Sequence, residues 1–220
     1  MNKEPLFDYL KQQKAEMLAE LLETAFDTMN TQQRRDTFSS VVKNLPPAKI
    51  VGKKLLAEIK QFHKDSFHAL YYAPFDINWK NFRHIPEETE QWCEKMADLL
   101  KDSSKLSKQG KHTIACKCFA LLYEVIFAMD EGEEIIFADE AGSWMIPVNE
   151  SEIMADYLSS LAYITQESPE KFTKKAIPLI ERDSYNSFSE RVYTLARRVA
   201  NKEQQKHLAA EVEAQNIRTH

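Results

Sequence analysis

The sequence predicts an all-α protein of about nine helices, arranged as an irregular stack of antiparallel helix hairpins. Three observations carry this prediction. Apolar residues recur at the three-to-four-residue spacing of amphipathic helices along most of the chain. Capping and proline signals separate these segments. Only 4 glycines in 220 residues argue against a fold built from many tight β turns. One small β-hairpin is expected near residues 134–147.

The first part of this single domain of 220 residues, 1–85, is predicted to hold three helices. Residues 4–29 form one helix with an apolar stripe, and a second begins at Asn30 or Thr31. The second ends before Pro46, because the residue before a proline disfavours helical geometry. The third runs from 47 to about 70. The expected inner faces are Leu10, Leu18, Leu21, Leu22, Ala25, Phe26 and Met29, then Phe38, Val41 and Val42, then Val51, Leu55, Ile59, Phe62 and Phe67.

Residues 86–147 form the predicted centre of the molecule. Pro86 suits the first position of a helix, and the acidic residues after it complement the helix dipole. Gly110 then breaks the pattern, and a second helix runs from 111 to about 129. This second helix is apolar over more than half of its circumference, which indicates burial on several sides. The apolar residues of the pair are Trp92, Met96, Leu99, Leu100 and Leu106, then Ile114, Ala115, Cys118, Phe119, Leu122, Tyr123, Val125 and Ile126.

The hairpin resembles one tetratricopeptide unit, over about residues 92–128. The resemblance rests on Gly110, Ala115 and Phe119 within KQGKHTIACKCF, where a small residue and an aromatic lie four residues apart. The sequence departs from that repeat at Ser103, where the family prefers glycine, and at Leu106, where it prefers tyrosine. The resemblance implies a helical scaffold that binds protein or peptide, and it implies no catalytic residue.

An acidic connector and the C-terminal helices, 149–215, complete the chain. Residues 130–152 contain eight acidic residues and no Lys or Arg. Within them, apolar residues on both sides of Gly142 suggest two short strands, because glycine can take the left-handed conformation of a hairpin loop. The helices that follow begin at Asn149, Ser168, Ser187 and Asn201, each a favourable capping residue. Pro178 predicts a kink in the second of these helices.

Composition indicates a chain of the cytoplasm. Hydrophobic content of 43% and charged content of 29% are typical of globular proteins. Three cysteines do not form a disulfide framework, which favours a reducing compartment. The N-terminus has no apolar signal region, and the longest apolar run is interrupted by Glu124. We therefore expect no membrane association. The net charge of −5 makes nucleic-acid binding a weak expectation.

No local motif indicates catalysis or a cofactor. The sequence has no glycine-rich phosphate loop and no HExxH, GxSxG or CxxC motif. His112 and Cys116, with Cys93 and Cys118, could supply four zinc ligands. However, Cys116 and Cys118 face apart on a helix, so buried hydrophobic cysteines are favoured.

A second cluster of titratable residues lies near the end of the third helix. It consists of His63, Asp65 and His68. The two histidines are five residues apart, so they are splayed by more than one helical turn. A surface or capping role is favoured over a metal site or a general base.

The candidate partner-binding residues lie in the acidic connector and at the end of the preceding hairpin. Asp139 and Glu140, near Trp144, form either a solvated turn or a surface for a basic partner. The lysine-rich end of the hairpin could be that partner, in the same copy or in another. Its residues are Lys101, Lys105, Lys108, Lys111 and Lys117.

The sequence is compatible with three functions. The leading hypothesis is a non-enzymatic interaction or scaffold protein, which should expose an apolar patch or groove. The second is an enzyme whose site is assembled near the aromatic segment 71–85, with His63, His68, Arg83 or His84. The third is a weak nucleic-acid binder acting through the lysine faces at 43–64 and 101–117. A homodimer is plausible, because two-fold dimers are the commonest oligomers.

Overall fold

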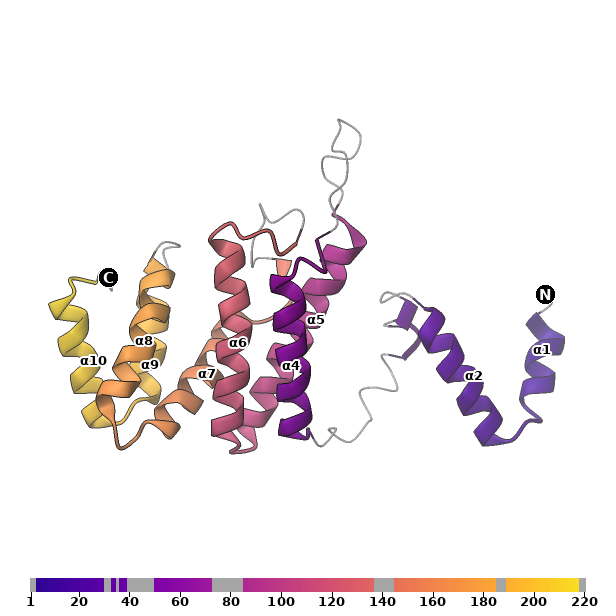
Figure 1. The fold of residues 1–220 in the computed structure, drawn as a ribbon. Coiled ribbons are helices and arrows are strands. Elements are labelled where there is room, and N and C mark those ends of the chain that lie inside the picture. Colours follow the sequence, from indigo (N-terminus) through magenta and orange to yellow (C-terminus); the bar gives the residue numbers. More distant parts are fainter. Residues whose placement is uncertain are drawn as a thin grey trace. The chain divides into compact units, whose positions relative to one another are not determined.

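Helices make up all the regular secondary structure among the residues that the computed structural model describes (Figure 1). These residues are 3–29, 33–34, 36–38, 50–72, 85–136, 145–184 and 189–217. The chain divides into two units, Met1–Lys49 and Ile50–His220, and each is described by itself. The division falls inside the region 1–85 that the sequence analysis assigned to one helical part.

The first unit contains α1 (Lys3–Leu10) and α2 (Ala15–Thr28), and residues 33–34 and 36–38 are also helical. The prediction of one helix over 4–29 was therefore wrong. Between α1 and α2, the N–H groups of Gln12 and Gln13 donate to carbonyls only three residues back, which tightens the chain out of the α-helix. The linker contains neither glycine nor proline, and nothing in the structure explains why the break falls there.

Helix α4 (Gly52–Phe67) opens the second unit and is shorter than the predicted helix over 47–70. Val51 is extended before it, and Ala69 follows it with a φ of 52°. The predicted inner face is confirmed at Leu55, Ile59 and Phe62, which are buried, and is wrong at Val51 and Phe67, which are exposed. At the first end the buried position is instead Gly52, which lies beside Ile114. At the other end it is Ser66, which accepts a hydrogen bond from Trp92.

Helices α5 (Glu87–Lys108) and α6 (His112–Asp130) form the centre of the second unit. The chain turns between them at Gly110, whose φ of 74° favours glycine. Helix α6 contacts α4, α5 and α7, and Figure 1 shows it beside α4 and α5. Ala115 and Phe119 are fully buried. The other residues predicted to be buried in α5 and α6 are buried as well, except Ile114, which is partly buried.

The predicted β-hairpin near 134–147 has no support among the described residues, none of which lies in a strand. Ile135 and Ile146 are buried, but neither is in a strand. Residues 137–144, which include the predicted turn, lie outside the described part. The apolar character of Ile135 and Ile146 therefore indicated their burial correctly, but it did not show whether the backbone there forms a strand.

Four helices follow: α7 (Glu150–Ile164), α8 (Pro169–Ser184), α9 (Ser189–Val199) and α10 (Lys202–Ala214). The predicted cap of α7 is confirmed, because Asn149 Oδ1 accepts from the N–H of Glu152 at 3.3 Å. The capping box of α10 is complete: Asn201 and Gln204 each accept from the other's N–H. Ser187 lies outside the described residues, and Pro178 lies inside α8.

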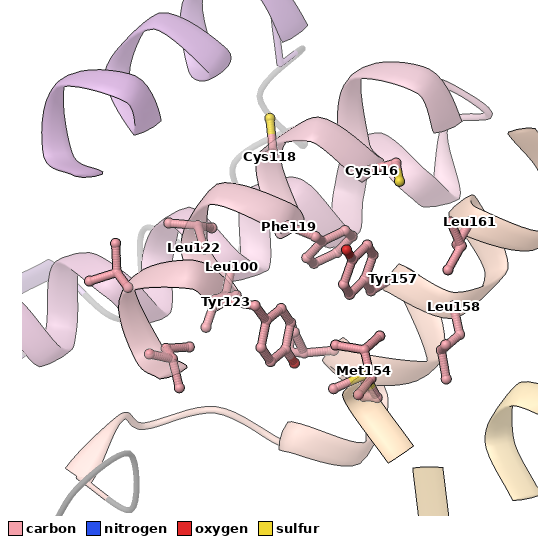
Figure 2. Packing of buried hydrophobic residues seen from close by; sticks show 14 of the residues in the cluster. Leu100, Cys116, Cys118, Phe119, Leu122, Tyr123, Met154, Tyr157, Leu158 and Leu161 are labelled. Atoms are coloured by element: carbon pink, nitrogen blue, oxygen red, sulfur yellow. The ribbon is translucent and has the colours of Figure 1, made fainter. Parts of the chain in front are cut away.

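One hydrophobic core runs through the second unit, from Leu55 in α4 to Val212 in α10. Helix α7 contacts α5, α6 and α9, and α8 contacts α9 and α10, so the core passes from helix to helix. At its centre the ring of Tyr157 stacks between Phe119 and Tyr123, at centroid distances of 5.3 and 5.5 Å (Figure 2). Burial raises the pKa of both tyrosines above its usual range.

Candidate functional site

The first candidate site is the apolar face of α1 and α2. Neither helix contains a buried residue. Large apolar side chains on the two helices are between 36% and 56% exposed, which is unusual for residues with helical periodicity. In α2, helical spacing places the four acidic residues on the opposite face. The exposed apolar residues are Leu6, Phe7, Tyr9, Met17, Leu21, Leu22 and Phe26.

Within this unit, Phe26 has the best-defined surroundings. Its ring packs edge-on against Phe38 at a centroid distance of 5.5 Å. The guanidinium group of Arg34 lies 4.6 Å from the ring of Phe26, and its Nε donates to the Phe26 carbonyl at 2.9 Å. Phe26 nevertheless keeps 42% of its surface exposed, so these contacts leave much of the apolar face uncovered.

The predicted partner-binding lysines differ in their surroundings. Lys101 is exposed, and Lys105 pairs with Asp102 on its own helix at 2.8 Å. Lys108 Nζ lies 2.7 Å from Glu152 and 3.4 Å from Asp156 on α7. The hydrogen bond to Glu152 raises the pKa of Lys108. A partner that bound Lys108 would therefore compete with these carboxylates.

The acidic half of that predicted surface lies outside the described residues. It consists of Asp139, Glu140 and Trp144. The acidic groups that the structure does place beside the lysine-rich end of α5 belong to α7, because Glu152 and Asp156 meet Lys108 there. The predicted contact between this end of α5 and the residues at 139–144 stays a prediction.

The candidate zinc ligands do not form a cluster. Among the described residues, no group of three His, Cys, Asp or Glu side chains is close enough to hold a metal ion. Cys93, Cys116 and Cys118 are free and buried, and Cys116 and Cys118 leave α6 in different directions (Figure 2). Burial raises the pKa of Cys93 and of Cys118 to about 11. These thiols therefore stay protonated at neutral pH. In this state they are unreactive and pack as small hydrophobic side chains.

The predicted cluster of His63, Asp65 and His68 is also dispersed. His63 Nε2 lies 3.2 Å from a carboxylate oxygen of Glu124 on α6, within ion-pair distance but not aligned for a hydrogen bond. Asp65 accepts from Gln61, and His68 ends α4 at the surface. Arg83 and His84, with the rest of residues 73–84, lie outside the described part of the chain.

The second candidate site is a depression of about 340 Å³ where α7 and the turn after it meet the end of α9 and the start of α10. Tyr163 forms one wall. Tyr163 as a residue is 58% exposed, and its ring lies against the ring of His112, with centroids 4.3 Å apart. The lining residues are His112, Ser159, Ala162, Tyr163, Gln166, Val199, Asn201 and Gln204.

Several polar groups of this depression are already hydrogen-bonded within the protein. The Gln204 side-chain amide donates to the Ala162 carbonyl at 3.0 Å and to Thr165 at 3.2 Å. Asn201 Nδ2 donates to the Gln166 carbonyl at 3.1 Å, and its Oδ1 serves the cap of α10. Asn201 and Gln204 therefore hold the two sides of the depression together and are not its main binding groups.

A seam of buried hydroxyl groups lies behind His112. His112 Nδ1 is 3.3 Å from Ser160 Oγ, and Ser160 Oγ is 2.8 Å from Ser107 Oγ. Ser107 Oγ is 3.1 Å from the carbonyl oxygen of Asp156, and Ser104 contacts the carboxylate of Asp156. The three serines are buried at the contact between α5 and α7.

Sequence reasoning did not identify this seam or the depression. The available signal was the presence of Ser103, Ser104 and Ser107 on the otherwise mostly apolar inner face of α5. Buried hydroxyl groups require hydrogen-bond partners, so a buried serine face predicts a polar neighbour. Ser103 donates to the Leu99 carbonyl of its own helix, but the partners of Ser104 and Ser107 lie about fifty residues away in sequence. Local spacing cannot name those distant partners.

Comparisons of the chain with protein-family models, with curated proteins and with solved structures find no match. Among the described residues, α6 is long and apolar enough to span a membrane by length and composition. Half of its most apolar stretch is buried inside the fold. Core helices of soluble proteins share this composition, so α6 is weak evidence for a membrane span.

Proposed function

We propose that this chain is a non-enzymatic interaction protein that binds another protein or peptide through the apolar face of α1 and α2. The observation that carries the proposal is the exposure of seven large apolar side chains on two helices with no buried residue. Contiguous exposed apolar surface is characteristic of sites that another molecule covers.

The energetics favour a partner that contributes apolar surface of its own. Burying the exposed half of one such side chain stabilises a complex by on the order of 1 kcal/mol. Association costs about 4 to 15 kcal/mol in lost translational and rotational freedom. The seven side chains together contribute about 7 kcal/mol, which lies within the range of that cost and leaves little net affinity. A partner that binds tightly must therefore bring a complementary apolar face.

In this proposal the second unit is a helical scaffold. We propose that α5 and α6 form a tetratricopeptide-like hairpin within an irregular stack of antiparallel helices. The left-handed conformation of Gly110 and the full burial of Ala115 and Phe119 are consistent with such a unit. The proposal of a cytoplasmic location rests on the sequence and on three free, buried cysteines.

The test uses the full chain with Leu21 and Leu22 both replaced by Glu. This change should abolish the capture of any specific partner while leaving the thermal unfolding of the second unit unchanged. The matched control replaces Glu20 and Glu23 with Gln on the opposite face, and it should retain the partner. Quantitative mass spectrometry of co-purified proteins compares the three chains.

Sedimentation of the same chains tests whether the partner is a second copy. A dimer of the wild-type chain that is lost with Leu21→Glu and Leu22→Glu would identify the apolar face as a homodimer interface. If the doubly substituted chain keeps every partner and every assembly state of the wild type, the proposed function is wrong.

A further inference from the structure

The hydrogen bonds of the buried seam determine which nitrogen of His112 carries the proton. The carbonyl of Asp156 can only accept, so Ser107 must donate its single hydroxyl proton to it. Ser107 then has only lone pairs left for Ser160, so Ser160 donates to Ser107. The hydroxyl proton of Ser160 is now used, and the contact with His112 requires Nδ1–H as the donor.

A neutral His112 therefore carries its proton on Nδ1 and a lone pair on Nε2. Nε2 makes no hydrogen bond to any described residue, and it is not among the fully buried nitrogen atoms that lack a partner. His112 also lines the depression. The seam thus holds a hydrogen-bond acceptor in fixed orientation where solvent can reach it.

The surroundings of that acceptor suit a flat, largely apolar group. The exposed ring of Tyr163 lies beside His112, and Ala162 and Val199 add apolar surface to the lining. Ser159 contributes a hydroxyl group and Gln166 an exposed side-chain amide, while Asn201 and Gln204 are already hydrogen-bonded. A volume of about 340 Å³ is at the small end for ligand pockets, which suits one ring system.

We propose that this depression is a binding site for a planar ring that bears an N–H donor. The ring lies against Tyr163, and its N–H donates to Nε2 of His112. Such a ring has two sources: the indole of a tryptophan in a bound peptide, or a free nitrogen heterocycle such as a nucleobase. This site shares no residue with the apolar face of α1 and α2 and does not depend on the proposed function.

The first experiment measures the tautomer directly. Nitrogen NMR of the full chain, labelled at its histidine rings, should show His112 protonated on Nδ1 when the ring is neutral. The His112→Phe variant assigns the signal by its disappearance and keeps an aromatic ring against Tyr163. A neutral His112 protonated on Nε2 would overturn the inference, because Nε2 would then be a donor and could not accept the ring N–H.

The second experiment titrates the full chain with two donor-bearing probes, N-acetyltryptophanamide and adenosine. Saturable shifts of the His112 and Tyr163 signals should appear with at least one of them below about 10 mM. Preference for the tryptophan probe indicates a peptide source, and preference for adenosine indicates a free heterocycle. The 1-methyl derivative of N-acetyltryptophanamide lacks the N–H, and if the tryptophan probe binds, it should bind at least tenfold more weakly.

Two outcomes of this titration contradict the proposal. One is the absence of saturable shifts with both donor-bearing probes, and the other is equal binding of the methylated and unmethylated tryptophan probes. The Ser160→Ala variant, which removes the acceptor of Nδ1–H, should weaken binding several-fold. Its matched control is Ser151→Ala on the same helix. If Ser160→Ala fails to fold, His112→Phe supplies the same comparison.

Discussion

Helices α2 and α6 are both predominantly apolar and have very different surroundings. Apolar residues make up more than half of each helix, although α2 also carries four acidic residues on one face. Helix α6 buries nine residues against α4, α5 and α7, whereas α2 buries none. The apolar pattern of a helix therefore specifies a face that can be buried, and the neighbouring elements decide whether it is.

The same contrast bears on stability. Isolated helices shorter than about 12 to 15 residues are marginal in water, because nucleation is costly. Helices α1 and α2, with 8 and 14 residues, fall in or near this class unless something covers them. Helix α6 takes its stability from tertiary packing. The difference explains why the first unit is where we expect a partner and the second is where we expect a permanent fold.

The largest expected effect comes from removing a ring from each region. Phe119→Ala in α6 should lower the free energy of unfolding by about 3 to 5 kcal/mol, because the fully buried ring leaves a cavity. Phe26→Ala in α2 should cost less than about 1 kcal/mol, because much of that ring is already exposed. Urea unfolding measures both. Equal losses of unfolding free energy would remove the distinction between the two regions. If Phe119→Ala does not fold, Phe119→Leu is a milder substitution at the same position.

The next effect is a loss of stability in alkali that only the second unit should show. The unfolded thiols of Cys93 and Cys118 lose their protons above about pH 8.5, whereas the folded thiols keep theirs up to about pH 11. The unfolded chain then binds fewer protons, so the unfolding free energy falls as pH rises, by about 1.4 kcal/mol per pH unit and thiol.

This pH dependence is measured by urea unfolding between about pH 8.5 and 10. Replacing Cys93 and Cys118 with Ala should flatten the slope in that interval. The helicity of α1 and α2, which contain no cysteine, should not follow it. A slope that is unchanged in the doubly substituted chain would show that other groups cause it, since Cys116, whose pKa burial also raises, should retain only part of it.

Substitutions at helix caps should have a smaller effect: one should destabilise a helix of the second unit, and the other should stabilise a helix of the first. Asn201→Ala removes the capping box of α10 and should cost about 1 kcal/mol. Helix α2 begins after Lys14, which provides no side-chain cap. Lys14→Ser should therefore raise the helical signal of α2 in circular dichroism. A change in the unfolding midpoint of the core in Lys14→Ser would contradict the separation of the two regions.

The smallest effect concerns surface ion pairs, which both regions contain. Lys108→Met removes the pairs with Glu152 and Asp156 and should lower stability by about 1 kcal/mol, because Lys108 and Glu152 are exposed and screened. Lys11→Met should have a comparable or smaller effect, since its pair with Asp8 is more exposed. The control is Lys101→Met, which removes no ion pair among the described residues. Thermal unfolding at low and high salt measures all three, and a salt-independent loss would indicate lost packing.

Sequence patterns predicted most of the second unit correctly. Capping residues located the starts of α7 and α10, and helical periodicity identified the buried faces of α5 and α6. The errors arose where local signals were weak. The break between α1 and α2 has no glycine or proline to mark it, and buried apolar residues at 135 and 146 were interpreted as strands.

The candidate sites, too, were only partly predictable from the sequence. The apolar stripe of α2 was visible in the sequence, but its exposure was not, because exposure depends on what lies beside it. His112 attracted attention only as a zinc ligand. Its hydrogen bond to Ser160, forty-eight residues away, gives it a different role that no spacing rule predicts.

By itself, the sequence determined that this chain is helical, where most helices of the second unit begin, and which faces of them are apolar. Hydrogen bonds and side-chain contacts within one helix span only three or four residues, so they can be read from the order of amino acids. Only the tertiary structure decided that α6 is covered, that α2 contains no buried residue, and that Ser107, Ser160 and His112 meet. Those outcomes depend on long-range packing between complementary surfaces, which short sequence windows do not encode.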